Sequence, residues 1–200
     1  MKVAEAEDKG IRLTIHTDET PCNPRTEFDH FGKMVCWHRR YNLGDKHDFS
    51  TPDDFQEWFK EQGLSVILPL YLYDHSGITI RTSSFNDRWD SGQVGWTYVT
   101  SEQILKEYSA KKITPELLAR AAKVLTAEVK EYDTYLRGEI YGYNLEKVHD
   151  CGECGKEVAE HIDSCFGFFG SDWEENGMTD NIGKEYKFLF DKLKDVRRHF

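Results

Sequence analysis

The sequence predicts an α+β fold in which an antiparallel or mixed sheet of about six or seven strands packs against about four helices. Three patterns carry this prediction: apolar residues that alternate with polar ones, apolar residues that step by three and four, and the irregular order of the two kinds of segment. Strands and helices that alternate regularly are typical of a parallel doubly wound sheet, so their irregular order favours antiparallel pairing.

The length of the chain bounds the number of domains. At 200 residues, the chain has the size of one domain, since domains usually have about 100 to 200 residues. We therefore predict a single domain over residues 1–200. Residues 1–10 are charged and lack an apolar stretch, so we expect them to be flexible.

Strands are predicted where apolar residues alternate. The first is Ile11–Ile15, and a short one follows at Met34–Trp37. The runs Val66–Tyr73 and Ile78–Thr82 flank a short polar loop and predict a hairpin. Pro69 lies in the first of these runs, so it predicts an edge or a bulge at that point.

Two more strand predictions complete the sheet. A strand is expected at Val94–Val99, and a second hairpin at Tyr141–Leu145 and Ile162–Phe168. Residues 147–157 form an insertion at the turn of that hairpin.

Helices are predicted where a capping residue precedes a stripe of apolar side chains. Thr51 and Pro52 begin one that Gly63 ends, and a short one begins near Thr100. The longest spans 114–138, where Thr-Pro-Glu opens it and a glycine closes it. A last helix is expected at 183–199, with two arginines at its negative end.

The charge of the chain indicates what kind of partner it binds. Lys and Arg number 26 against 36 Asp and Glu, and the net charge of −10 is spread over both halves. An acidic surface repels phosphate backbones, so direct binding to nucleic acid is disfavoured. We expect a protein partner instead, a basic host protein that itself binds nucleic acid.

Other features bear on location and chemistry. No apolar run approaches the roughly 20 residues that span a bilayer, and the N-terminus has no signal-peptide pattern, so we expect a cytoplasmic protein without membrane association. Five cysteines at uneven spacing argue against a disulfide framework. Gly-rich phosphate loops and the common hydrolase motifs are not found in the sequence.

The motif Cys151-x-x-Cys154, followed by Gly155, has the spacing of two thiolates that bind one zinc ion in a tight turn. Zinc needs four ligands, and His149 is near enough in sequence to be a third. Cys165 lies too far along the predicted strand, which rises about 3.3 Å per residue. A zinc site of Cys151, Cys154 and His149 would therefore need a ligand from elsewhere, and an ordinary turn or a redox pair are the alternatives.

The polar segment Cys22–His47 is the first choice for a functional surface, because long polar loops between strands usually have a function. On a strand, Cys36 and His38 would share a face, and His30, Asp45 or His47 could complete a metal site or a Cys–His pair. The alternative is a set of turns and surface ion pairs. The catalytic candidates are His38, Cys36 and Asp45, and the ligand- or partner-binding candidates are Asn23, Arg25, His38, Arg39, Arg40 and Asp45.

The loop Asn86–Gln93 is rich in side-chain oxygens, and we add its Asp87 and Asp90 to the binding candidates. It lacks the carboxylate spacing of an EF-hand, so a capped turn is favoured over calcium. If this loop met the segment Cys22–His47 in one pocket, a ligand site would be indicated.

Five short stretches together resemble a family of uncharacterised proteins encoded by bacterial phages and prophages, over residues 11–170. The resemblance implies an accessory protein of a mobile element that acts inside a bacterial cell, and it carries over no catalytic residues. The stretches are Asn23-Pro24-Arg25, Met34-x-Cys36-x-His38-Arg39-Arg40-Tyr41-x-Leu43-Gly44-Asp45, Asp74-His75-Ser76-Gly77, Asp90-Ser91-Gly92-Gln93-x-Gly95-Trp96 and Asp163-Ser164-Cys165-x-Gly167-Phe168.

Two functions remain open on this evidence. The first is binding without chemistry, as an inhibitor of a host nucleic-acid-targeting defence complex such as a CRISPR effector; a protein that sequesters a signalling nucleotide is a variant of it. The second is a metal-dependent hydrolase or a nucleotide-binding protein that uses the histidine, cysteine and aspartate residues of segment 22–47.

Overall fold

The structure is a computed structural model in which residues 1–63, 65–87 and 89–196 are described. The chain forms two compact units. The central unit is Asn23–Arg137, and the terminal unit combines Met1–Cys22 with the segment that begins at Gly138. Each is described by itself below. The single domain over residues 1–200 stays a prediction.

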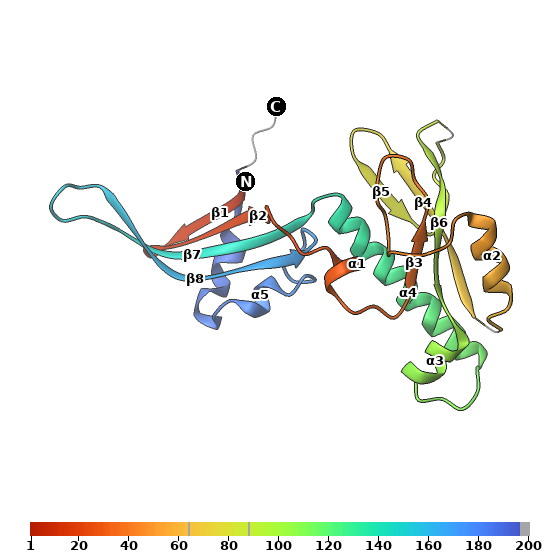
Figure 1. Cartoon of the computed structure of the whole chain (residues 1–200). Coiled ribbons are helices and arrows are strands. Elements are labelled where there is room, and N and C mark those ends of the chain that lie inside the picture. Colours follow the sequence, from red (N-terminus) through yellow and green to blue (C-terminus); the bar gives the residue numbers. More distant parts are fainter. Residues whose placement is uncertain (64, 88, 197–200) are drawn as a thin grey trace. The chain divides into compact units, whose positions relative to one another are not determined.

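The central unit contains a four-stranded antiparallel sheet in the order β3-β6-β4-β5 (Figure 1). Its strands are β3 (Lys33–Cys36), β4 (Val66–Asp74), β5 (Ile78–Arg81) and β6 (Ser91–Val99). Each of them was predicted from the sequence, and the predicted hairpin of β4 and β5 is confirmed.

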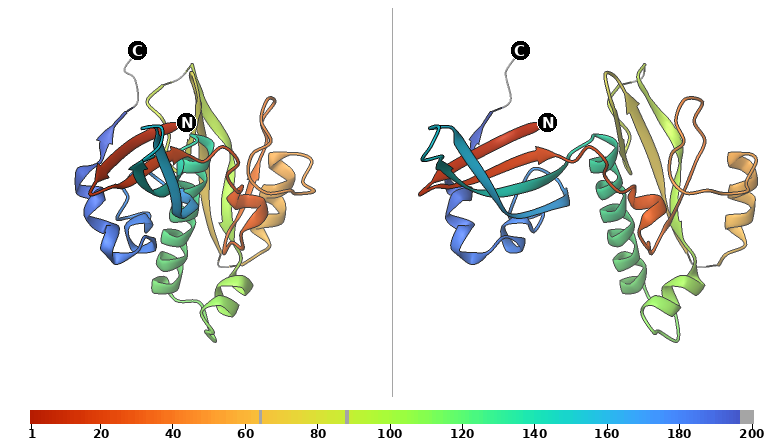
Figure 2. Two further views of the ribbon diagram at one scale, coloured as in Figure 1. Left: turned by 90° about the vertical axis from the view of Figure 1, so that its left-hand side faces the viewer. Right: turned by 60° about the vertical axis from the view of Figure 1, so that its left-hand side comes forward.

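Helices cover both faces of this sheet, as Figure 2 shows. On one face lies α4 (Pro115–Leu136), whose Tyr132 packs with buried residues of β4 and β5. On the other lies α2 (Pro52–Lys60), whose Phe55 is fully buried against Tyr98 of β6. Side chains that alternate along a strand point to opposite faces, so successive residues of the strands serve two separate cores.

Local sequence signals set the helix starts of the central unit. The Thr51 hydroxyl accepts from the Asp54 amide, and the Thr51 amide donates to the Asp54 carboxylate, which makes a capping box at the start of α2. Thr114 caps α4 in a similar way, by accepting from the Leu117 amide. The helices predicted at residues 51–63, 100–108 and 114–138 are confirmed. The two remaining helices of this unit are α1 (Pro24–Glu27) and α3 (Ser101–Glu107).

Pro69 has no amide hydrogen to donate, so within a sheet it fits only at an edge or a bulge. The neighbouring strand β5 pairs with β4 only from Tyr71 onward, so Pro69 faces an unpaired stretch of edge on that side. A register shift between Leu70 and Tyr71 follows in the pairing with β6. The predicted edge or bulge is therefore confirmed.

The terminal unit contains a five-stranded sheet in the order β8-β7-β2-β1-β9, and its pairings are also antiparallel. Its strands are β1 (Lys2–Asp8), β2 (Ile11–Thr17), β7 (Ile140–Asp150), β8 (Glu157–Phe169) and β9 (Lys194–Asp195). The second predicted hairpin is confirmed as β7 and β8, which are longer than the alternating residues indicated. The fold class α+β is thus confirmed, with the strands divided between two sheets.

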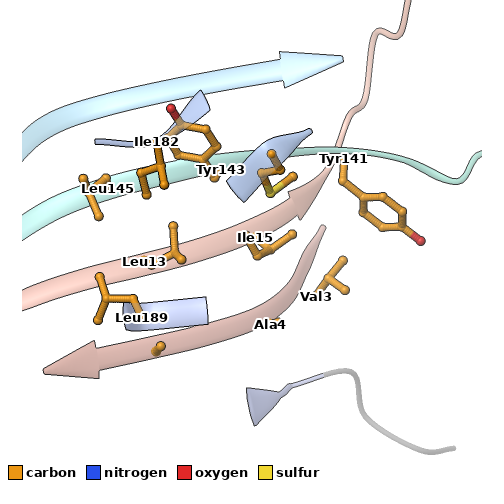
Figure 3. Close-up of a cluster of buried hydrophobic side chains, with 11 residues drawn as sticks. Val3, Ala4, Leu13, Ile15, Tyr141, Tyr143, Leu145, Ile182 and Leu189 are labelled. Atoms are coloured by element: carbon orange, nitrogen blue, oxygen red, sulfur yellow. The ribbon is translucent and has the colours of Figure 1, made fainter. Parts of the chain in front are cut away.

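The core of the terminal unit lies on one face of this sheet (Figure 3). It is covered by α5 (Met178–Asn181) and by the 3₁₀ helix η1 (Lys184–Lys192). The fully buried side chains of this core are Leu13, Ile15, Tyr143, Leu145, Met178 and Leu189.

Two predictions for the ends of the chain are wrong. Residues 1–10 are not a loose segment: β1 pairs with β2, and Val3, Ala4 and Ala6 are buried because they extend its apolar face. The last helix is shorter than predicted and of another type. Residues Lys184–Lys192 form a 3₁₀ helix, whose period of three matches the spacing of Tyr186 and Leu189, and β9 follows. Residues 197–199 of that prediction lie outside the described residues.

Among the described helices, none is long and apolar enough to cross a membrane.

Candidate functional site

The polar segment that the sequence singles out builds a buried cluster of ions beneath its own loops. This ion cluster consists of Arg25, Asp45 and Glu128. Nε and Nη2 of Arg25 donate to the two carboxylate oxygens of Asp45, at 2.9 and 2.5 Å. Nη2 also donates to the carbonyl of Gly32 at 2.9 Å, and the Arg25 side chain is only 1 % exposed. A planar guanidinium suits this two-pronged contact.

Glu128 of α4 closes the cluster from the other side. Its carboxylate accepts from the amides of Phe31 and Gly32 at 2.7 and 3.1 Å, and Nη1 of Arg25 lies 3.8 Å from it. Burial raises the pKa of Glu128, against the opposing effect of those two amides and of Arg25. Helix α4 is thereby fixed to the chain that leads into β3.

The remaining contacts of Asn23 and Asp45 are also with the chain itself. Asn23 caps α1 by accepting from the Arg25 amide at 3.0 Å. Asp45 accepts from the Met34 amide at 2.8 Å, and Tyr132 of α4 accepts from the Gly44 amide at 3.0 Å. Asn23, Arg25 and Asp45, which the sequence assigns to binding, therefore hold the loop in place.

The surroundings of Cys36 bear on the nucleophile pair that the sequence leaves open, which stays a prediction. Burial, and then the Asp45 carboxylate, raises the pKa of Cys36 to about 12, so its reactive thiolate is disfavoured at neutral pH. His47 contacts the carbonyl oxygen of Cys36 at 3.1 Å, through Nε2. His38 lies beyond the end of β3, where its Nδ1 accepts from the amides of Arg40 and Tyr41 at 3.3 Å.

The segment after β3 meets the loop before β6 in one pocket of about 370 Å³. Two loops that are far apart in sequence thus converge, as a ligand site requires. We call six of the side chains that line this pocket the rim. The rim consists of His38, Arg39, Arg40, Asp74, Trp89 and Asp90.

Ion pairs and hydrogen bonds join the rim residues across strands. Arg40 pairs with Asp74 at the end of β4, and the Tyr41 hydroxyl donates to the same carboxylate at 3.3 Å. Nδ1 of His75 lies 2.9 Å from Asp90. The two arginines of the rim balance its two aspartates, so the rim carries little net charge.

Trp89 is the most exposed large apolar side chain of those described, at 94 %. Asp87 fixes the turn that carries it, because its Oδ1 accepts from the amides of Trp89 and Asp90, each at 2.8 Å. The amides of Asp90 and Trp89 lower the pKa of Asp87. The backbone that carries the exposed indole is thus held in place.

A second pocket, of about 720 Å³, adjoins the first and shares Trp37, His38 and Arg39 with it. The loop Cys36–His47 lines it. Within the described residues, Nε1 of Trp37 and Nδ1 of His47 are buried and have no hydrogen-bond partner. A pocket of this size with unsatisfied polar atoms has the features of a small-molecule site.

The cysteine motif forms the turn between β7 and β8, in the terminal unit. Cys151 and Cys154 lie at this turn, and His149 is exposed on β7 opposite Val158. The amides of Glu153 and Cys154 lower the pKa of Cys151 by hydrogen-bonding to its sulfur. In the described part of the chain, no three His, Cys, Asp or Glu side chains lie close enough to hold a metal ion.

Sequence reasoning missed two residues that matter here. Glu128 belongs to the ion cluster, and its signal was a charge next to Val129 in the apolar stripe of α4. Trp89 belongs to the rim, and its signal was an aromatic residue in a polar loop with no strand or helix period. Both signals are visible in the sequence, although neither reveals what the residue contacts.

Comparison with known proteins gives no relative: no family model, no curated protein and no solved structure matches the chain.

Proposed function

We propose that this protein acts by binding a protein partner through the rim of the central unit, as an accessory protein of a mobile element in the bacterial cytoplasm. The partner would be a basic, nucleic-acid-targeting complex of host defence, such as a CRISPR effector, and binding would inhibit it. The observation that carries the proposal is Trp89, 94 % exposed beside the Arg40–Asp74 pair.

The composition of the rim supports binding to a protein. Tryptophan, tyrosine and arginine supply most of the binding energy of protein interfaces. Trp89 and Arg40 line this pocket, and the Tyr41 hydroxyl donates to Asp74, which lines it as well. Asp87 holds the turn of Trp89 in place, which reduces the entropy that binding would cost.

The charge of the whole chain supports a basic partner. The two arginines of the rim balance its two aspartates, so attraction comes from the net charge of −10 of the chain as a whole. Such a field raises the rate of encounter with a basic groove more than it raises affinity. The resemblance to phage-encoded proteins supports the same setting.

The test uses phage infection of bacteria that carry a CRISPR effector targeting the phage. Expression of the full chain should restore plaques, Trp89→Phe should retain this activity, and Trp89→Ala should reduce it at least tenfold. Purified chain and purified effector should form a complex that weakens as salt increases. If the chain neither restores infection nor binds such complexes, the proposal is wrong.

A second candidate function is the binding of a small anionic ligand such as a nucleotide, favoured by the larger pocket with its unsatisfied Trp37 and His47 nitrogens. Lys46 and Arg39 also line that pocket and would attract phosphate. A melting temperature that rises with a nucleotide in wild type, and does not rise in His47→Ala, would support this function. If no nucleotide raises the melting temperature of wild type, this function is excluded.

A further inference from the structure

The turn between β7 and β8 projects past the strands beside it. β2 pairs with β7 only as far as Lys147, so the residues that follow leave the sheet as a two-stranded hairpin (Figure 1). Arg12 of β2 donates to both carboxylate oxygens of Glu157 at 2.7 Å. Glu157 pairs with Asp150 next to the turn, so this ion pair ties the hairpin to the sheet near its turn. The cysteine motif is therefore presented at the end of a braced arm.

The backbone of the turn directs both cysteines toward one point. The Gly155 amide donates to the Cys151 carbonyl at 2.8 Å, and Gly155 has a φ of +66°, a conformation that glycine adopts without strain. The amides of Glu153 and Cys154 hydrogen-bond to the sulfur of Cys151, and the Cys154 thiol does so as well. Two adjacent sulfurs, with amides around one of them, form half of a tetrahedral zinc site.

The chain itself does not supply the other half. No third ligand-type side chain of the described residues joins the pair in a group that could hold a metal. Cys165 pairs with Tyr143, seven residues back from Asp150 on β7, and a strand rise of about 3.3 Å per residue puts it roughly 23 Å away. Four-coordinate zinc therefore needs two ligands from outside the chain.

We propose that one zinc ion joins two copies of this chain at the hairpin turns, through Cys151 and Cys154 of each copy. A twofold axis through the metal makes the two halves equivalent, as in most homodimers, and gives the four thiolates that structural zinc accepts. Each thiol loses its proton to solvent as its zinc–sulfur bond forms, so each dimer releases four protons. The proposal does not depend on the rim or on its partner.

The experiment uses the full chain kept reduced with a phosphine, with zinc added in steps. Light scattering and native mass spectrometry should show the apo chain as a monomer and the saturated chain as a dimer of twice the mass, with one zinc per two chains. A chelator should reverse this. Cobalt in place of zinc should give the absorption of four thiolate ligands.

Variants separate the site from the fold. Cys151→Ser with Cys154→Ser should stay monomeric and bind no zinc, while its circular dichroism and melting temperature match those of the apo wild type. Cys22→Ser, which changes another exposed cysteine, should dimerise like wild type. Zinc at one ion per monomer, no zinc bound, a dimer that ignores zinc, or a disulfide between Cys151 and Cys154 under these conditions would each overturn the proposal.

Discussion

The ion cluster and the rim each contain an arginine paired with a carboxylate, and the two pairs differ in their exposure to solvent. In each, an arginine meets a carboxylate of the central unit, yet the Arg25 side chain, in α1, is 1 % exposed and that of Arg40, after β3, is 66 % exposed. A buried pair must satisfy its hydrogen bonds within the chain, whereas an exposed pair exchanges them with water at little cost. The comparison shows that charged residues of one segment divide into a set buried within the fold and a set exposed at the surface.

The largest effect is expected from Arg25→Ala. It leaves the carboxylates of Asp45 and Glu128 buried without their cation, which typically costs about 3 to 5 kcal/mol. Urea unfolding followed by tryptophan fluorescence measures this, because four of the five tryptophans, at positions 37, 58, 89 and 96, lie in the central unit. A loss below about 1 kcal/mol would mean that the cluster is open to solvent and differs little from the rim.

Glu128→Gln tests how burial and pairing balance within the ion cluster. The pKa of Glu128 is raised from 4.5 in the folded chain, so its contribution to stability is fully present below 4.5 and is lost as pH rises through the folded pKa. The free energy of unfolding of wild type should therefore fall relative to that of Glu128→Gln as pH rises above 4.5, by about 1.4 kcal/mol for each unit of pKa shift. Urea titrations at several pH values measure this difference. If the free energy of unfolding of wild type rises relative to that of the variant instead, the attraction of Arg25 for the Glu128 carboxylate outweighs the effect of burial on it.

Signals that are local in sequence predicted most of the fold. The capping residues Thr51 and Thr114 act within one helical turn, and Pro69 restricts its own strand, so the elements around them could be located. The role of Arg25 could not be predicted in this way. Its burial depends on Glu128, which is far along the chain and is brought near only by the packing of α4. A basic residue followed by a turn is predicted to be exposed unless its partners are known.

The two loops that form the rim could be identified from the sequence, but their meeting in one pocket could only be raised as a question. The polar loops Cys22–His47 and Asn86–Gln93 were recognisable by composition, and the structure brings parts of both together. Which residues point outward was not recognisable, because Asp45 and Asp90 are the same residue type and differ only in what lies around them. Strand β1 and its pairing with β2 were missed, because residues 1–10 are mostly charged and their apolar side chains are few and small.

Arg40→Ala should have a small effect on stability. Its pair with Asp74 is at the surface, and exposed pairs contribute about 0 to 1 kcal/mol. The same urea experiment used for Arg25→Ala measures it, with Arg39→Ala as the matched control on the next residue. The comparison breaks down if Arg40→Ala lowers the free energy of unfolding nearly as much as Arg25→Ala does. It is sharpened if Arg40→Ala unfolds like wild type and loses partner binding.

The smallest effect on folding is expected from Trp89→Ala. A side chain that is 94 % exposed makes few contacts to lose, so the free energy of unfolding should change by less than about 0.5 kcal/mol. The fluorescence of the folded chain should nevertheless change clearly, because quenching by acrylamide should lose its most accessible component. If stability fell by more than about 1 kcal/mol, the indole would have to pack against the chain. It would then belong with Arg25 as part of the fold, and the rim would lose the side chain on which binding most depends.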